Sequence, residues 1–255
     1  MKLFYKKSGH GQPFVILHGL FGSLDNWQTV ANYLSQYFEV YIIDQRNHGR
    51  SPHDDRWNYA TMADDVNELV DENNLRNVIM LGHSMGGKTV MQYAAMYPEK
   101  LDKIIIADMG PKYYPTHHHF IIKALEAINV DTIQSRKEAE IILDKKLLDA
   151  STKQFLLKNL YWTEGDTKRM AWRFNLKAIK ENIECVGEEI KISNCTVRAL
   201  FIKGELSDYV KESDWTGIKS KFTNAELISI AGAGHWLHAD KPDEFIKTIL
   251  DFVNN

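Results

Sequence analysis

A tight turn around a serine constrains this chain more than any other feature. The turn is the segment GHSMG at residues 82–86, and the apolar run 78–81 before it predicts a buried strand. Residues 88–95 continue as a helix, so the spacing G-x-S-x-G lies between a strand and a helix, which is the setting of a nucleophile elbow. The turn is too tight for side chains at the two glycines, and it lifts the hydroxyl of Ser84 above the sheet edge. The amide of Met85 is predicted to point to the same spot and to stabilise an oxyanion there.

Apolar strands alternate with amphipathic helices over most of the 255 residues. This alternation predicts an α/β fold, with a mostly parallel sheet covered by helices on both faces. The predicted strands are 3–5, 14–17, 40–43, 78–81, 104–107, 197–202 and 225–230. The predicted helices around them are 26–36, 59–72, 88–95, 209–221 and 243–253.

The pattern changes between residues 110 and 193, where strand-like runs vanish and helical periodicity dominates. The predicted helices there are 120–128, 137–148, 152–160 and 166–183. An insert of this size is too large for a loop and predicts an all-helical cap, inserted after the strand that ends at Asp108. We therefore expect a core formed by residues 1–109 and 194–255, and a cap formed by residues 110–193.

Composition and charge exclude several classes of function. Charged residues make up 25% and hydrophobic residues 44% of the chain, and the net charge is −3, which gives no reason to expect a nucleic acid or an anionic membrane as partner. Two cysteines, Cys185 and Cys195, are too few for a disulfide framework. The first residues show no signal peptide, and no apolar run has membrane-spanning length. We expect a soluble, cytoplasmic monomer or homodimer.

A serine hydroxyl needs a base, and ten histidines compete for that role. Ligands of open α/β sheets bind beyond the carboxyl ends of the strands, so residues that directly follow strands are the candidates. His235 follows the last predicted strand behind two glycines, where a loop can place its imidazole over Ser84. The run His117–His119 has no carboxylate or cysteine beside it, so we expect neither a metal nor another cofactor.

The acid that orients the histidine has two candidates. Asp108 ends the strand directly after the strand of the nucleophile. Asp208 follows the next-to-last strand, one residue beyond the position where such an acid is commonest, which is occupied here by Ser207. Both keep the order Ser–Asp–His along the chain. We predict Asp108, with Asp208 as the alternative.

Two further sets of residues complete the predicted site. The second oxyanion donor is expected from the loop 18–22, where the amide of Leu20 or of Phe21 can point towards the same space as that of Met85. The cap is rich in aromatic residues, which is consistent with an apolar pocket for an acyl group. The predicted substrate contacts are Trp172, Trp236 and Tyr209.

Four segments of this chain resemble the α/β-hydrolase superfamily, and more narrowly its YbfF-type esterases and their eukaryotic relatives. They are HGLFGSLDNW at 18–27, DQRNHGRS at 44–51, GHSMGGK at 82–88 and WRFN at 172–175. The resemblance implies hydrolysis of acyl esters and acyl thioesters without a metal. It also places the acid after the strand that follows the elbow, matching Asp108, and a serine in the usual acid position, matching Ser207. Asp208, next to that serine, departs from the pattern.

The leading hypothesis is a serine carboxylesterase or acyl-thioesterase that acts on a small-molecule ester or thioester through an acyl-enzyme. The same fold allows a C–C bond hydrolase, a haloperoxidase-like enzyme or the lyase of menaquinone synthesis. A non-catalytic binding module on this fold is a further alternative. Such modules normally lose the nucleophile or the histidine, whereas Ser84 and His235 are both present here.

Overall fold

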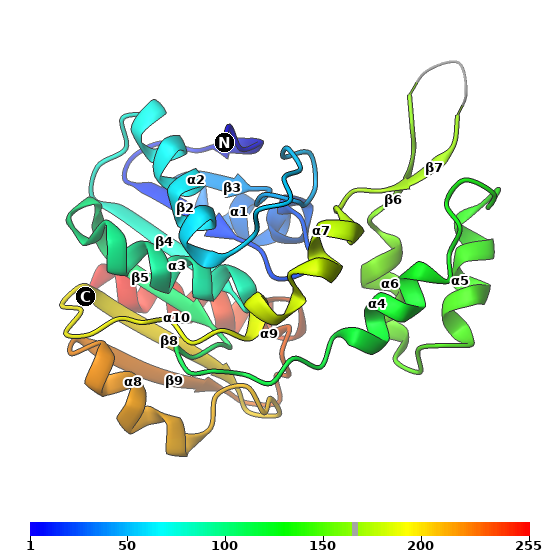
Figure 1. Ribbon diagram of the computed structural model, residues 1–255. Helices are drawn as coiled ribbons and strands as arrows, with labels where there is room; N and C mark the ends of the chain where they lie inside the picture. Colours follow the sequence, from blue (N-terminus) through cyan, green and yellow to red (C-terminus); the bar gives the residue numbers. More distant parts are fainter. Residues whose placement is uncertain (165–167) are drawn as a thin grey trace.

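The computed structural model describes residues 1–164 and 168–255 (Figure 1). Its centre is a seven-stranded sheet with the order β1-β3-β2-β4-β5-β8-β9. Only β1 pairs antiparallel within it, and the other strands pair parallel. The strands are β1 (Tyr5–Ser8), β2 (Pro13–Leu17), β3 (Glu39–Ile43), β4 (Val78–His83), β5 (Leu101–Ala107), β8 (Arg198–Gly204) and β9 (Ala225–Ile230). The predicted α/β class with a mostly parallel sheet is confirmed.

Helices cover both faces of the sheet because consecutive strand residues point to opposite sides. In β2, Val15 and Leu17 join one apolar cluster with α2 and α3, whereas Phe14 and Ile16 join another with α1 and α10. The helices of the core are α1 (Gln28–Leu34), α2 (Tyr59–Glu72), α3 (Met85–Met96), α8 (Trp215–Lys221), α9 (Leu237–Asp240) and α10 (Pro242–Asn254). Short 3₁₀ turns are η1 (Leu24–Trp27), η2 (Pro98–Lys100), η3 (Ile183–Gly187) and η4 (Glu212–Asp214). The predicted helix 209–221 therefore begins later, at Trp215, after a 3₁₀ turn.

The cap contains more than helices, so the expectation of an all-helical insert is wrong. Its helices are α4 (His119–Glu126), α5 (Arg136–Asp144), α6 (Ala150–Leu157) and α7 (Leu176–Glu181). Between α6 and α7, an antiparallel hairpin pairs β6 (Leu160–Trp162) with β7 (Met170–Trp172). The runs Leu-Tyr-Trp and Met-Ala-Trp suit a pleated, half-buried surface, and this outweighed the helical spacing. The part of the predicted helix 166–183 that falls on 166–167 lies outside the described residues.

The cap elements lie together beyond the carboxyl ends of the sheet strands (Figure 1). Their apolar side chains, such as Ile122, Leu125 and Leu143, belong to the same buried cluster as the α2–α3 face of the core. Two segments join the cap to the core, and we name residues 110–118 the outgoing connection and residues 187–193 the returning connection. The shared cluster means that cap and core are packed together rather than merely tethered.

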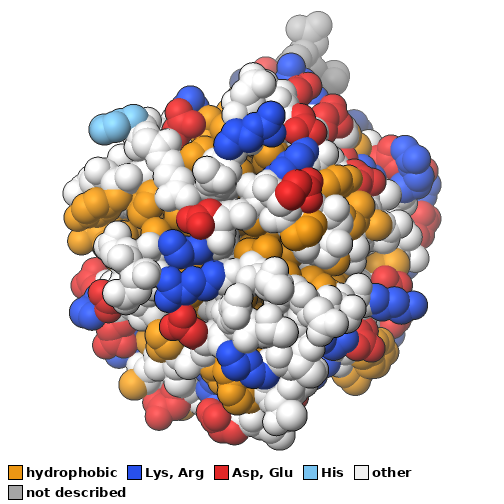
Figure 2. Space-filling view, turned by 90° about the vertical axis from the view of Figure 1, so that its left-hand side faces the viewer, with side chains coloured by type: hydrophobic (Ala, Val, Ile, Leu, Met, Phe, Trp, Pro, Cys, Tyr) orange, Lys and Arg blue, Asp and Glu red, His pale blue; other side chains and the backbone are white. Residues whose placement is uncertain are grey.

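On the face shown in Figure 2, basic and acidic side chains are interspersed with hydrophobic ones. Within residues 1–164 and 168–255, none of the helices combines the length and the apolar character needed to cross a membrane.

Candidate active site

Ser84 lies in a strained turn between β4 and α3. Its backbone angles are φ 53° and ψ −117°, a conformation that a non-glycine residue rarely adopts. A Cβ atom on Gly82 would lie 2.2 Å from the carbonyl oxygen of Gly86, and one on Gly86 would lie 2.4 Å from that of Leu17. The two glycines are therefore required for the turn to close. The amide of Ser84 donates to the carbonyl of Ala107 at 3.1 Å, which ties the elbow to β5.

Asp108 and His235 form a hydrogen-bonded pair. Nδ1 of His235 donates to Oδ2 of Asp108 at 2.7 Å, and the aspartate is fully buried. The amide of Gly204 donates to Oδ1 at 3.2 Å, and the hydroxyl of Ser207 donates to Oδ2. Three donors thus satisfy a carboxylate that water does not reach. Because the proton of His235 is held on Nδ1, Nε2 is left free to act as a base.

Asp208, the alternative acid, lies elsewhere. Its side chain is 96% exposed and pairs with Nζ of Lys211 at 3.4 Å. Of the two carboxylates that sequence reasoning left open, only Asp108 contacts His235.

In the loop after β2, the two amides predicted as oxyanion donors, those of Leu20 and Phe21, differ in their hydrogen bonding. The amide of Phe21, a residue with φ 58°, donates to Nε2 of His48 at 3.2 Å. Nδ1 of His48 in turn donates to the carbonyl of Arg46 at 3.0 Å, which fixes the tautomer in which Nε2 accepts. Burial lowers the pKa of His48 to about 3, so this imidazole is neutral. The amide of Phe21 is therefore engaged, whereas no hydrogen bond to another described residue occupies the amide of Leu20.

His83, next to Ser84, supports the loop of His235. Its Nε2 lies 2.9 Å from the carbonyl oxygen of His235, which can only accept, so His83 carries its proton on Nε2. Burial lowers the pKa of His83 well below its usual value, so this histidine is neutral. The backbone of the predicted base is thus anchored to the strand that carries the predicted nucleophile.

A cavity of about 560 Å³ brings most of the predicted site residues together. Ser84 and His235 both line it, together with Leu20, Phe21, Tyr209 and Trp236 from the core. The cap contributes the apolar side chains of Phe120, Ile121, Phe155 and Leu156, and also polar ones, among them Ser151, Thr152, Gln154 and Lys158. The ring of Tyr209 stacks on the imidazole of His235 with centroids 4.0 Å apart and an interplanar angle of 17°. Met85 is buried directly after Ser84 at the start of α3.

Trp172, the third predicted substrate contact, does not line this cavity. It lies in β7 and stacks on Phe174 with centroids 5.1 Å apart, and Phe174 packs edge-on against Phe21. The tryptophan is therefore part of the packing between the cap hairpin and the loop 18–22. Its aromatic character could not distinguish these two roles.

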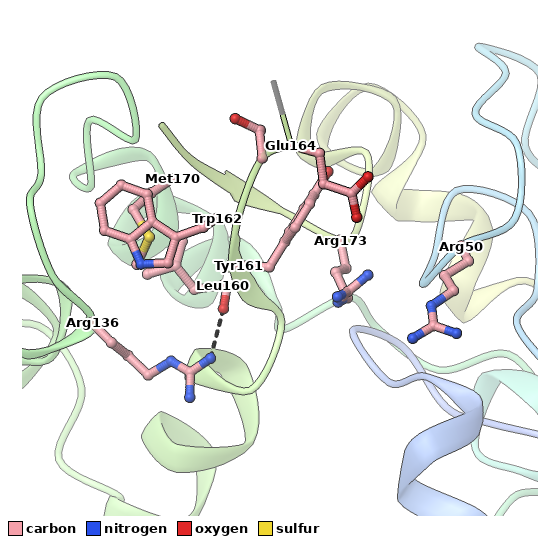
Figure 3. Close-up of a pocket in the computed structure, with 9 residues that line it drawn as sticks. Arg50, Arg136, Leu160, Tyr161, Trp162, Glu164, Met170 and Arg173 are labelled. Atoms are coloured by element: carbon pink, nitrogen blue, oxygen red, sulfur yellow. Dashed lines mark hydrogen bonds between the residues drawn. The ribbon is translucent and has the colours of Figure 1, made fainter. Parts of the chain in front are cut away.

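A second hollow, of about 940 Å³, has neither a serine nor a histidine in its lining (Figure 3). It is lined by Arg50 from the core and by Arg136 and Arg173 from the cap. The guanidinium of Arg173 lies 4.4 Å from the ring centre of Tyr161. These arginines can hold an anion, but the lining offers neither the serine nor the histidine that the predicted acyl transfer needs.

The side chains of the run His117–His119 contact different partners. Nε2 of His117 lies 3.1 Å from the hydroxyl of Tyr209, and Nε2 of His119 lies 3.0 Å from Oε1 of Glu184. Within the described part of the chain, no group of three or more metal-ligating side chains is positioned around a common point.

Comparison with known proteins places this geometry in a family. The family described as "alpha/beta hydrolase fold" matches residues 12–132. The chain is 36% identical to esterase YbfF of Escherichia coli, over 96% of this chain and 94% of that protein. It is 35% identical to the sn-1-specific diacylglycerol lipase ABHD11 of Xenopus laevis, over 98% of this chain and 82% of that protein. A solved structure described as a marine microorganism esterase superposes with a TM-score of 0.95 at 44% identity, covering 99% of both chains. The chain therefore belongs to the α/β-hydrolase family, as an esterase/lipase-type member.

Proposed function

We propose that this protein hydrolyses carboxylic esters or thioesters of small to medium acyl groups, through an acyl-enzyme on Ser84. The observation that carries the proposal is the contact of His235 with the buried carboxylate of Asp108 at 2.7 Å, in the cavity that Ser84 lines. A nucleophile, a base and an orienting acid in this order and setting are the parts of a Ser-His-Asp triad.

In the first half-reaction, Oγ of Ser84 attacks the acyl carbon while Nε2 of His235 takes the hydroxyl proton. The charge that develops on the acyl oxygen is stabilised by the backbone amides of Leu20 and Met85. Asp108 stabilises the imidazolium and keeps the ring in the tautomer that accepts at Nε2. The carbon–oxygen or carbon–sulfur bond then breaks, and His235 returns the proton to the leaving alcohol or thiol.

In the second half-reaction, water replaces the alcohol or thiol. His235 takes a proton from the water, whose oxygen attacks the acyl carbon of the ester formed on Ser84. Collapse of the tetrahedral intermediate releases the carboxylic acid, and the proton returns to Oγ of Ser84. The chain supplies every group that these steps use, so the proposed mechanism includes no metal or cofactor.

The cavity supports an acyl substrate. Its volume of about 560 Å³ falls in the range of small-molecule sites, and the cap contributes aromatic and aliphatic side chains to it. We assign substrate contact to Tyr209 and Trp236, which line the cavity beside His235. The names of the two curated relatives, an esterase and a diacylglycerol lipase, also favour an ester of an acyl group. Two unpaired cysteines, Cys185 and Cys195, are consistent with a cytoplasmic location.

Labelling with a fluorophosphonate probe, combined with a substrate panel, tests this function. The wild type should be labelled and should hydrolyse p-nitrophenyl esters or acyl-coenzyme A thioesters, and Ser84→Ala should lose the label and at least about 10³-fold in kcat. Comparing kcat/KM across both series identifies the acyl length and separates ester from thioester preference. Labelling or turnover that persists in a folded Ser84→Ala protein would exclude the mechanism.

A further inference from the structure

The two connections between cap and core are paired with each other. The amide of Tyr114 in the outgoing connection donates to the carbonyl of Gly187 in the returning connection at 2.8 Å. The amide of Ile190 donates back to the carbonyl of Pro111, also at 2.8 Å. The fit is close, because a Cβ atom on Gly187 would lie 2.1 Å from the carbonyl oxygen of Tyr114. The cap is thus attached through a two-segment junction.

Lys88 reaches this junction from the helix of the nucleophile. It lies one turn after Ser84 in α3, and its side chain is fully buried. Its ammonium donates to the carbonyl of Lys112 in the outgoing connection at 2.8 Å. It also donates to the carbonyls of Gly187, at 3.3 Å, and Glu188 in the returning connection. Three N–H donors therefore meet carbonyl oxygens from both connections.

Aromatic rings surround the same ammonium. Nζ of Lys88 lies 5.0 Å from the ring centre of Tyr114, in the outgoing connection, and 6.0 Å from that of Tyr59, in α2. Both distances lie within the range of cation–π attraction. A buried cation is costly unless its hydrogen bonds are satisfied, so this arrangement is stable only while both connections stay in place.

The burial of Lys88 also affects its ionisation. Burial lowers the pKa of this ammonium to about 7, while the carboxylates of Glu188 and Glu189 favour the charged form. Burial raises the pKa of the two neighbouring phenols, Tyr59 and Tyr114, so both are neutral. Loss of a proton would leave two N–H donors for three carbonyls and would remove the attraction to the rings.

We propose that Lys88 is a positioning residue that holds both connections of the cap against the helix of the nucleophile and thereby sets the cap side of the acyl cavity. The proposed catalytic steps do not use Lys88, and its effect on substrate is exerted through the cap. The side chains that depend on this placement are Phe120, Ile121, Phe155 and Leu156, which line the cavity from the cap. The activity readout rests on the proposed function, whereas the exchange readout below does not.

Lys88→Met tests the proposal, because it keeps the length of the side chain and removes all three donors. Amide hydrogen exchange in residues 110–118 and 187–193 should be at least about tenfold faster than in wild type. For p-nitrophenyl octanoate, KM should rise at least about fivefold, whereas kcat for p-nitrophenyl acetate should stay within about twofold, because we expect the short acetyl group to make few contacts with the cap side chains. Lys88→Arg retains N–H donors, so its increases in amide exchange and in KM for octanoate should be smaller than those of Lys88→Met.

Lys100→Met is the matched control. Lys100, in η2 just after α3, is partly buried, and its ammonium donates to Asn67 and Asp71 on α2, away from both connections. This variant should show wild-type exchange in the connections and a wild-type dependence on acyl length. Unchanged exchange in folded Lys88→Met would overturn the proposal. So would an equal loss of kcat for acetate and octanoate, because that pattern would mean that Lys88 supports the elbow rather than the cap.

If Ser84→Ala keeps its activity, the proposed function is wrong, but the exchange result still decides the role of Lys88. If Lys88→Met does not fold, exchange in the wild type decides it instead. The amides of Tyr114 and Ile190 should then open together, with the same dependence on urea. Independent opening of the two amides would show that the connections are not held as one junction.

Discussion

Nε2 of His48 accepts a hydrogen bond from the backbone amide of Phe21 at 3.2 Å. This bond distinguishes the amide of Phe21 from that of Leu20, its neighbour in the loop after β2. The amide of Phe21 is engaged, so the amide of Leu20 remains for the oxyanion in the proposed mechanism. His48 itself is neutral and is held by the carbonyl of Arg46 at 3.0 Å. In the proposed mechanism, His48 takes part in no chemical step but orients the loop that carries the oxyanion amide.

His48→Ala should lower kcat by about 10- to 100-fold with little change in KM, because the loop loses the bond that orients it and the oxyanion donor is displaced. Steady-state kinetics on p-nitrophenyl acetate, with near-UV circular dichroism to verify folding, measures this. His10→Ala is the control, since His10 is exposed in a distant polar loop. A folded His48→Ala protein with wild-type kcat would show that Leu20 is oriented without His48.

Asp108→Asn should lower kcat by about 10²- to 10⁴-fold, because an amide favours the wrong imidazole tautomer and does not stabilise imidazolium. Asp208→Asn should lower kcat less than about tenfold, since its side chain is at the surface and pairs with Lys211. The two single variants in one assay decide the identity of the acid. The reverse ranking would transfer the role to Asp208.

Ser84→Ala, His235→Ala and the double variant should all lose kcat to a similar extent, because a nucleophile and its base act as one unit. Each single loss should reach at least about 10³-fold, leaving only the contribution of the oxyanion amides and of binding. Losses that multiply in the double variant would mean that His235 acts independently of Ser84.

The ionisation of Lys88 predicts how stability depends on pH. Its pKa is lowered to about 7 in the folded protein from a usual value of 10.5, so between these values the unfolded chain binds more protons than the native state. The free energy of unfolding of the wild type, relative to Lys88→Met, should therefore rise as pH increases from about 7 towards 10.5, and stay level below about pH 7. Urea denaturation of both proteins at pH 6 to 9.5 measures this difference. A constant difference would show that Lys88 keeps its usual pKa.

Local features of the chain already predicted the fold class and the elbow. The apolar runs of the strands, the helical spacing between them and the two glycines around Ser84 each act over a few neighbouring residues, where backbone sterics and burial dominate. This is why the parallel sheet and the position of Ser84 after β4 could be predicted. The cap was predicted less well, because a short aromatic run such as 160–162 suits a strand or a helix until its partner is known.

Contacts between distant residues depended on the tertiary structure. Asp108 and Asp208 both follow strands, and only the path of the chain brings Asp108 to His235, 127 residues away. The same holds for Phe21 and His48, whose bond distinguishes two adjacent amides, and for Trp172, which packs on Phe174 instead of facing the cavity. The sequence by itself determined which chemical groups stand at the ends of the strands, because that depends on local pattern. The tertiary structure decided which of them meet, because hydrogen bonds of a few ångströms depend on how the whole chain packs.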